Sequence, residues 1–204
     1  MKNYICINGK KTELTKEQLK QLKQLGLEMP VIELTDNGKI AKIGDYEFIV
    51  LKSKNAGETR LLLKNSLCDS VFGEDNNDFR QSKVKTILDE FAQKIEALIG
   101  SDNLLTHTVD LTADDGLKDY GTIGAKMSLL TADVYRENVY IIDEYKLNKW
   151  WWLVTPCSTK THDWETAVKC VSPSGDIGDC DCYDSVDGVR PFCIVKSCIF
   201  VSNN

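Results

Sequence analysis

The sequence predicts an α+β protein with two helices and a mostly antiparallel sheet, because helical and strand-like segments are segregated along the chain rather than alternating. Residues 42–51 and 59–63 are β-rich runs joined by a polar stretch, which is typical of a hairpin. Residues 78–99 carry apolar side chains at intervals of three and four, which is typical of an amphipathic helix. Strands are also expected at residues 150–154, 167–171, 192–195 and 198–201.

The first 35 residues form a separate unit. Asn8 and Gly9 separate two short β-favouring segments and predict a hairpin. Thr15 and Gln18 have the spacing of a capping box at the start of a helix. That helix carries a narrow stripe, Leu19, Leu22 and Leu25, and we expect it to end at Gly26. It packs on its own domain, or it acts as an arm for homo-oligomerisation or docking.

The remaining residues, 36–204, are expected to form one domain. Its first helix ends at Gly100, and residues 106–124 are dense in Asp, Gly and Thr, which indicates a long loop. A second helix is expected at residues 131–145. Neighbouring strand residues point to opposite faces, so Trp151 is expected to point away from the side taken by Trp152, which we predict to lie in the core.

Charge excludes some classes of function. The 204 residues carry a net charge of −6, and the lysines are spread along the chain, so the basic patch of a nucleic-acid binder is missing. No apolar stretch approaches the roughly 20 residues of a membrane helix, and no membrane insertion is expected. The N-terminus turns polar too early for a signal peptide, so we expect synthesis in the cytoplasm, with incorporation into a virion as an option.

No residue pattern predicts catalysis, a cofactor or a metal. His107 and His162 are the two histidines, and neither lies in a nucleophile or zinc-ligand context. Cys180 and Cys182 have the wrong spacing for a zinc knuckle, and we interpret the eight cysteines mostly as free thiols. The acidic residues 176–187 do not match an EF-hand loop, although weak calcium binding stays an alternative to a solvated loop. We therefore predict a binding protein rather than an enzyme.

Three segments carry a resemblance to a known family: residues 151–156 (WWLVTP), 168–175 (VKCVSPSG) and 188–192 (GVRPF). In this order they resemble an uncharacterised domain family, frequent in phages, prophages and gut bacteria, with the signature W-W-L-x-(S/T)-P … V-x-x-x-G … G-V-R-P. The resemblance runs from about residue 40 to residue 202. Val154 departs from the commoner form, which has arginine there.

That family looks like a branch of the C-type-lectin-like fold, which formylglycine-generating enzymes and the variable proteins of diversity-generating retroelements also use. The resemblance implies two helices and a twisted sheet whose late strands and loops present a ligand face, without implying calcium or sugar. Trp152, Gly188, Arg190 and Pro191 are assigned structural roles. We expect Gly188 to take a backbone conformation that other residues disfavour. Arg190 is expected to be buried against carboxylates or carbonyls, with a ligand contact as the alternative.

The expected ligand face lies on two C-terminal loops. Trp164 and Tyr183 are the strongest contact residues, because large amphipathic rings supply contact area at low entropic cost. Their alternative is burial by their own loops. The full predicted set is His162, Asp163, Trp164, Asp179, Asp181, Tyr183, Asp184, Ser185 and Asp187.

Residues 174–187 use a restricted set of amino acids. Each can be encoded by a codon that ends in a pyrimidine, and Lys, Glu, Gln, Met and Trp are absent. Retroelement-driven mutagenesis of adenines yields this alphabet, and a plain acidic loop yields it as well. The leading hypothesis is a non-enzymatic phage or prophage protein, adhesin-like, that binds a protein or cell-surface ligand. The alternatives are an intracellular regulator that binds a host protein and an oxidase of the formylglycine-generating type.

Overall fold

The computed structural model describes residues 3–7, 10–15, 17–18, 21, 37–183 and 185–197. Strands β1 (Asn3–Ile7) and β2 (Lys10–Leu14) pair antiparallel and confirm the N-terminal hairpin. The backbone N–H of Thr15 donates to Gln18 Oε1 and that of Gln18 to Thr15 Oγ1, at 2.9 and 3.2 Å, so the capping box is confirmed. The leucine stripe, Gly26 and the strand expected at residues 198–201 lie outside the described residues.

The first large sheet joins the two ends of the main domain. Its order is β10-β15-β5-β4-β3, and β7 also pairs with β15. The paired strands are β3 (Ile40–Ile43), β4 (Tyr46–Leu51), β5 (Glu58–Leu63), β7 (Leu104–Leu105), β10 (Met127–Ser128) and β15 (Phe192–Lys196). The single strand expected at residues 42–51 is wrong, since Gly44, with φ 57°, turns the chain between β3 and β4.

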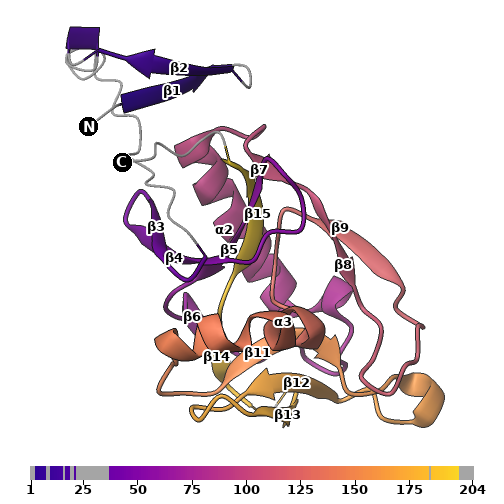
Figure 1. Cartoon of the computed structure of the whole chain (residues 1–204). Coiled ribbons are helices and arrows are strands. Elements are labelled where there is room, and N and C mark those ends of the chain that lie inside the picture. Colours follow the sequence, from indigo (N-terminus) through magenta and orange to yellow (C-terminus); the bar gives the residue numbers. More distant parts are fainter. Residues whose placement is uncertain are drawn as a thin grey trace.

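The second large sheet carries the C-terminal signature segments. Its order is β13-β12-β11-β14-β6, and all neighbours are antiparallel except β11 and β14. The strands are β6 (Cys68–Ser70), β11 (Trp151–Pro156), β12 (Ala167–Val171), β13 (Ile177–Asp181) and β14 (Asp187–Val189). Figure 1 shows β11 to β14 in orange and yellow beneath the first sheet, whereas β6, at the edge, is purple.

Two α-helices lie between residues 37 and 197, as predicted. Helix α2 (Lys83–Ile99) begins after Ser82, whose hydroxyl accepts the N–H of Lys85, and it ends at Gly100 with φ 86°. The predicted start at residue 78 is wrong, because the short 3-10 helix η1 (Phe79–Gln81) precedes this cap. Helix α3 (Ala132–Ile142) continues into the 3-10 helix η2 (Asp143–Tyr145), close to its predicted bounds.

Each helix covers a separate hydrophobic core. Strand residues alternate between the cores: Trp152 and Val154 pack with α2, whereas Trp151 and Leu153 pack with α3. The sequence analysis placed only Trp152 in a core. Trp151 does point to the opposite face, but there it meets α3 rather than solvent and is 1% exposed.

Two segments expected to be loops contain strands. Residues 106–124 contain β8 (His107–Asp110) and start β9 (Thr122–Ala125), which form an antiparallel hairpin. The acidic segment 174–187 contains β13, all five residues of which pair with β12. The cysteine interpretation also needs a correction, because Cys170 and Cys180 form a disulfide across β12 and β13. Cys68, Cys157 and Cys193 are free thiols.

Candidate functional site

Three segments that are distant in sequence meet beside the β12–β13 hairpin: residues 73–78, 158–166 and 181–183, here called the loop cluster. The N–H of Cys182 donates to the carbonyl of Thr166 at 2.8 Å, and its carbonyl accepts the N–H of Gly73 at 3.0 Å. The N–H of Asn77 donates to the carbonyl of Glu165 at 2.7 Å. Backbone hydrogen bonds therefore tie the expected ligand loops to a segment that precedes α2.

Asn77 is fully buried and is the hub of the loop cluster, because its side chain forms hydrogen bonds to several of the segments that meet there. Its side-chain amide nitrogen donates to the carbonyls of Ser158 and Ala167 at 3.0 and 2.7 Å. Its amide oxygen accepts the Tyr120 hydroxyl at 2.7 Å. One asparagine therefore satisfies groups from several chain segments, which fixes the base of residues 158–166. The sequence analysis missed Asn77, because none of its partners is near it in sequence.

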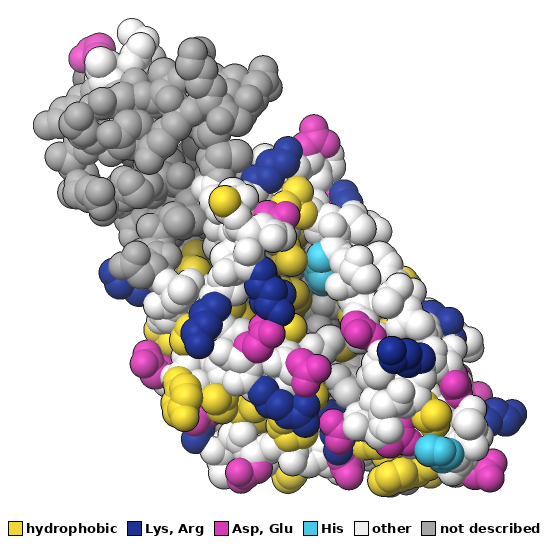
Figure 2. Space-filling model, turned by 45° about the vertical axis from the view of Figure 1, so that its right-hand side comes forward, with side chains coloured by type: hydrophobic (Ala, Val, Ile, Leu, Met, Phe, Trp, Pro, Cys, Tyr) yellow, Lys and Arg dark blue, Asp and Glu magenta, His cyan; other side chains and the backbone are white. Residues whose placement is uncertain are grey.

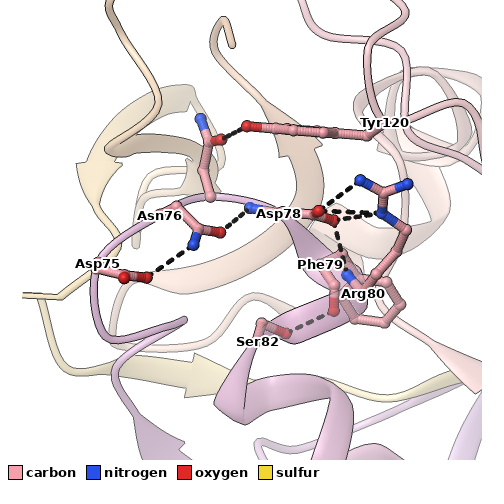
Figure 3. A network of polar contacts seen from close by, with 8 residues as sticks. Asp75, Asn76, Asp78, Phe79, Arg80, Ser82 and Tyr120 are labelled. Atoms are coloured by element: carbon pink, nitrogen blue, oxygen red, sulfur yellow. Dashed lines mark hydrogen bonds and ion pairs between the residues drawn. The ribbon is translucent and has the colours of Figure 1, made fainter. Parts of the chain in front are cut away.

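Asp78 and Arg80 brace the same region (Figure 3). The Asp78 carboxylate accepts Arg80 Nη2 at 2.6 Å and caps η1 by accepting the Arg80 N–H. The Arg80 guanidinium lies 5.4 Å from the centroid of the Tyr120 ring, within the range of a cation–π contact. Burial is the main reason that the pKa of Tyr120 is raised to about 12, so this phenol stays protonated and donates to Asn77 at neutral pH.

Two aspartates of the segment after β8 hold residues 158–162. Asp115 Oδ2 accepts the Ser158 hydroxyl at 2.6 Å and lies 2.9 Å from His162 Nδ1. Asp119 Oδ2 accepts the hydroxyls of Thr159 and Thr161 at 2.6 and 2.5 Å. Hydroxyl donors lower the pKa of both carboxyl groups, that of Asp115 chiefly through Ser158 and that of Asp119 chiefly through Thr159. These contacts fix the loop that carries Trp164.

The structure brings the two predicted aromatic contacts onto neighbouring segments. Trp164 and Tyr183 are 49% and 42% exposed, so neither ring is buried by its own loop. The hydrogen bond from the Cys182 N–H to the Thr166 carbonyl joins the segment that carries Tyr183 to the one that carries Trp164. Asp163 is exposed in the left-handed region with φ 53°, and Ser185 donates its N–H to Asp181. Asp184 lies outside the described residues.

Two of the predicted acidic contacts, Asp179 and Asp187, make their contacts outside the loop cluster. Asp179 and Asp181 alternate with Cys180 on β13, and Asp179 Oδ1 accepts Lys169 Nζ at 2.7 Å. Lys169 also lies 3.0 Å from Asp114 Oδ2, so Asp179 belongs to an ion-pair network. Asp187 instead lies beside Cys170 and Cys180. The expectation that residues 174–187 form a loop throughout is therefore wrong, because residues 177–181 pair with β12 as strand β13.

The residues that were assigned structural roles have well-defined surroundings. Trp152 is fully buried and donates its indole N–H to the Ser70 carbonyl at 2.8 Å. Pro191 lies between β14 and β15, and its carbonyl accepts the Leu63 N–H. The conformation expected for Gly188 is wrong, since its φ is not positive. A Cβ there would lie 3.0 Å from Ser66 Oγ, so close packing explains the glycine.

Three thiols among the described residues, those of Cys68, Cys157 and Cys193, have a raised pKa. Burial raises the pKa of Cys157, and it raises the pKa of Cys193 to about 12. Burial is also the main cause of the raised pKa of Cys68. A nucleophilic cysteine needs a lowered pKa, so these three thiols are poorly suited to catalysis at neutral pH.

Two polar cavities lie among the described residues, and one of them adjoins the loop cluster. It has a volume of about 390 Å³ and is lined by residues 73–76 together with the start of α2, including Lys83. The other, of about 300 Å³, lies at the start of α3 and is lined by Asp114, Lys118 and Arg136 among others. No cysteine lines either cavity. Acidic and basic side chains are interspersed over the face shown in Figure 2, without a continuous patch of one sign.

The comparisons with known proteins give one match. Residues 104–197 match the family model described as Domain of unknown function (DUF6273). The matched stretch runs from β7 through β15, so it includes Trp164 and Tyr183 but not Asn77. No curated protein and no solved structure matches the chain. None of the helices among the described residues is long and apolar enough to cross a membrane.

Proposed function

We propose that this chain is a non-enzymatic binding protein that recognises a protein or cell-surface ligand through the loop cluster. The observation that carries the proposal is the pair of exposed aromatic side chains, Trp164 and Tyr183, on segments joined by backbone hydrogen bonds. Half-exposed aromatic rings are typical anchors of binding surfaces, because they bury much apolar area and lose little conformational entropy.

Preorganisation of the loop supports the proposal. Residues 158–166 are held from beneath by Asn77 and from one side by Asp115 and Asp119. A loop held in this way has already lost much of its conformational freedom, so binding costs less free energy than it would with a mobile loop. This anchoring also explains why so many polar side chains form hydrogen bonds to one short surface segment.

The finer fold and the origin are part of the same proposal. Two helices, the mostly antiparallel sheets and late strands next to the exposed loops are in keeping with a C-type-lectin-like domain. The phage or prophage origin is proposed from the sequence resemblance alone. Retroelement diversification would act on exposed positions such as Tyr183, whereas the paired residues of β13 have less freedom. Sequencing the gene tests this: diversification predicts AAY codons in a template copy of the segment and substitutions at their adenines.

The two alternatives make different predictions. An intracellular regulator would use the same loop cluster to bind a soluble host protein, so it differs in the ligand and not in the site. An oxidase would need a reactive cysteine pair in a pocket. The raised pKa values of Cys157 and Cys193 and the absence of cysteine from these two cavities favour binding over oxidation.

Photo-crosslinking tests the proposal at residue resolution. The photoreactive amino acid p-benzoylphenylalanine replaces Trp164 or Tyr183, and in a control it replaces Tyr140, an 85% exposed tyrosine on α3. Each purified chain is irradiated with the soluble and the envelope fractions of host cells. We expect the same crosslinked species from positions 164 and 183 and not from position 140. Equal crosslinking from all three positions would contradict the assigned face, and the fraction that yields the product distinguishes an adhesin from a regulator.

A further inference from the structure

Three metal-ligating side chains lie together on the second sheet, away from the loop contacts described above. The Sγ atoms of Cys170 and Cys180 and a carboxylate oxygen of Asp187 all lie within 4.8 Å of one another. They come from β12, β13 and β14, so the fold and not a local motif brings them together. Cys170 is buried, and the other two residues are partly buried.

The sheet register explains this juxtaposition. Cys170 is opposite Trp152 on one neighbouring strand and Gly178 on the other, so Cys180 is its diagonal neighbour. Val189 packs in the same core as Trp152 and Cys170, and Asp187 lies two residues before it. Side chains two apart in a strand share a face, so Asp187 is on the side of the sulfur atoms.

One carboxylate oxygen in this group lacks a partner. Asp187 Oδ2 is buried and accepts no hydrogen bond in the described part of the chain. The neighbouring Cys170–Cys180 disulfide cannot donate a hydrogen bond to this oxygen, because it carries no hydrogen on sulfur. An unpaired buried carboxylate is costly, and a bound ion is one of the few arrangements that would satisfy it.

We infer that the reduced chain binds a thiophilic divalent cation such as Zn²⁺ through Cys170 Sγ, Cys180 Sγ and Asp187 Oδ2. Thiolate and carboxylate are both established zinc ligands, and three protein ligands leave the fourth tetrahedral position for water or another donor. With Zn–S distances of about 2.3 Å the two sulfur atoms must stand about 3.8 Å apart. The Cα atoms of the two cysteines are 6.2 Å apart, and side-chain rotation provides this separation once the disulfide is open.

Metal binding at this site depends on the redox state of the cysteine pair. A dithiol reductant supplies two electrons and two protons, which converts the Cys170–Cys180 disulfide into two thiols while the dithiol becomes a disulfide. The cation then displaces the two thiol protons and binds two thiolates and the carboxylate. The disulfide and the metal are therefore mutually exclusive, and Asp187 Oδ2 gains a partner only in the metal-bound state.

Cobalt binding tests the site directly, because Co²⁺ bound by thiolates absorbs in the near ultraviolet whereas aqueous Co²⁺ does not. The full chain is reduced with a phosphine, freed of metal and titrated with Co²⁺ and then with Zn²⁺. We expect one cobalt per chain with a thiolate band that Zn²⁺ abolishes, and no band for the oxidised chain. The variants are Cys170→Ser, Cys180→Ser and Asp187→Asn, with Cys68→Ser and Asp181→Asn as the thiol and carboxylate controls.

The cysteine variants should lose the band, whereas the two controls should keep it. Asp187→Asn keeps both cysteines and should raise the Kd for Co²⁺ more than about tenfold. A tenfold increase is typical when a residue that only contacts a metal ligand is removed. Circular dichroism before titration shows that each variant is folded. A reduced parent chain without a thiolate band, a band that survives Cys170→Ser, or unchanged affinity in Asp187→Asn would each overturn the inference.

Discussion

The Arg190 guanidinium lies 5.0 Å from the centroid of the Trp151 ring, and its identified hydrogen-bond partners are backbone carbonyls rather than carboxylates. Its Nε donates to Leu63, and its Nη2 donates to Lys64 and Tyr145. Burial lowers the pKa of Arg190 to about 10, so the group is still charged at neutral pH. A single buried cation thus connects β5, η2 and β11.

Arg190→Lys should therefore destabilise the fold by about 3 kcal/mol, because an ammonium cannot reproduce the planar donor geometry or the stacking on Trp151. Urea unfolding at pH 7 measures the change. Arg136→Lys, on the exposed side of α3, is the control and should stay within about 0.5 kcal/mol of the parent. An equal decrease in the free energy of unfolding in both variants would show that Arg190 does not stabilise the fold more than an exposed arginine does.

Asn77→Asp should destabilise the protein by about 2 to 4 kcal/mol. The new oxygen replaces the donor to Ser158 and Ala167, so two carbonyls lose their partner and face a carboxylate oxygen. Hydrogen exchange should also quicken at the amide of Cys182, which bonds to the same loop. Asn148→Asp, at an exposed position, is the control. Unchanged exchange at Cys182 in Asn77→Asp would contradict the role of Asn77 as the hub.

His107 makes stability depend on pH. Burial lowers its pKa from 6.5 to about 4, and its Nε2 lies 2.9 Å from Ser128 Oγ. The unfolded chain therefore takes up a proton at this residue before the folded chain does, and stability is lost as the pH falls from 6.5 towards 4. The loss reaches about 2.5 kcal/mol at pH 4.5. The difference between the urea midpoints at pH 7 and pH 4.5 should be smaller in His107→Gln than in the parent. An equal difference in the two proteins would refute this assignment.

The Cys170–Cys180 disulfide should stabilise the metal-free protein. It closes a loop with a sequence separation of 10 residues, which corresponds to about 2.5 to 3 kcal/mol in the chain-entropy model. A reductant should lower the urea midpoint of the parent by more than it lowers that of the double variant Cys170→Ser/Cys180→Ser. Cys68→Ser should respond to the reductant as the parent does, since Cys68 is a free thiol.

Local patterns were sufficient to predict much of the fold. Apolar spacing located α2 and α3, and β-rich runs located β11, β12 and β15. Strand β13 escaped prediction because its sequence, IGDCD, has weak intrinsic strand preference and depends on its pairing with β12. Helix α2 was placed too early, because Ser82 interrupts an apolar pattern that otherwise continues from η1.

The candidate site was predictable only in part. Trp164 and Tyr183 stood out as large rings in polar segments, and both are exposed. Asn77 and the Cys170–Asp187 neighbourhood gave no sequence signal, because their contacts depend on the order of strands in the sheet. Short-range spacing carries no information about such contacts.

The most direct test of the proposed function is the affinity of the crosslinked ligand, once purified, for Trp164→Ala and Tyr183→Ala. Isothermal titration should show a loss of at least about 2 kcal/mol, or roughly 30-fold in Kd, for each variant. Tyr140→Ala, an exposed aromatic on α3, should bind as tightly as the parent. Parent-like affinity in both loop variants would contradict a ligand site on the loop cluster.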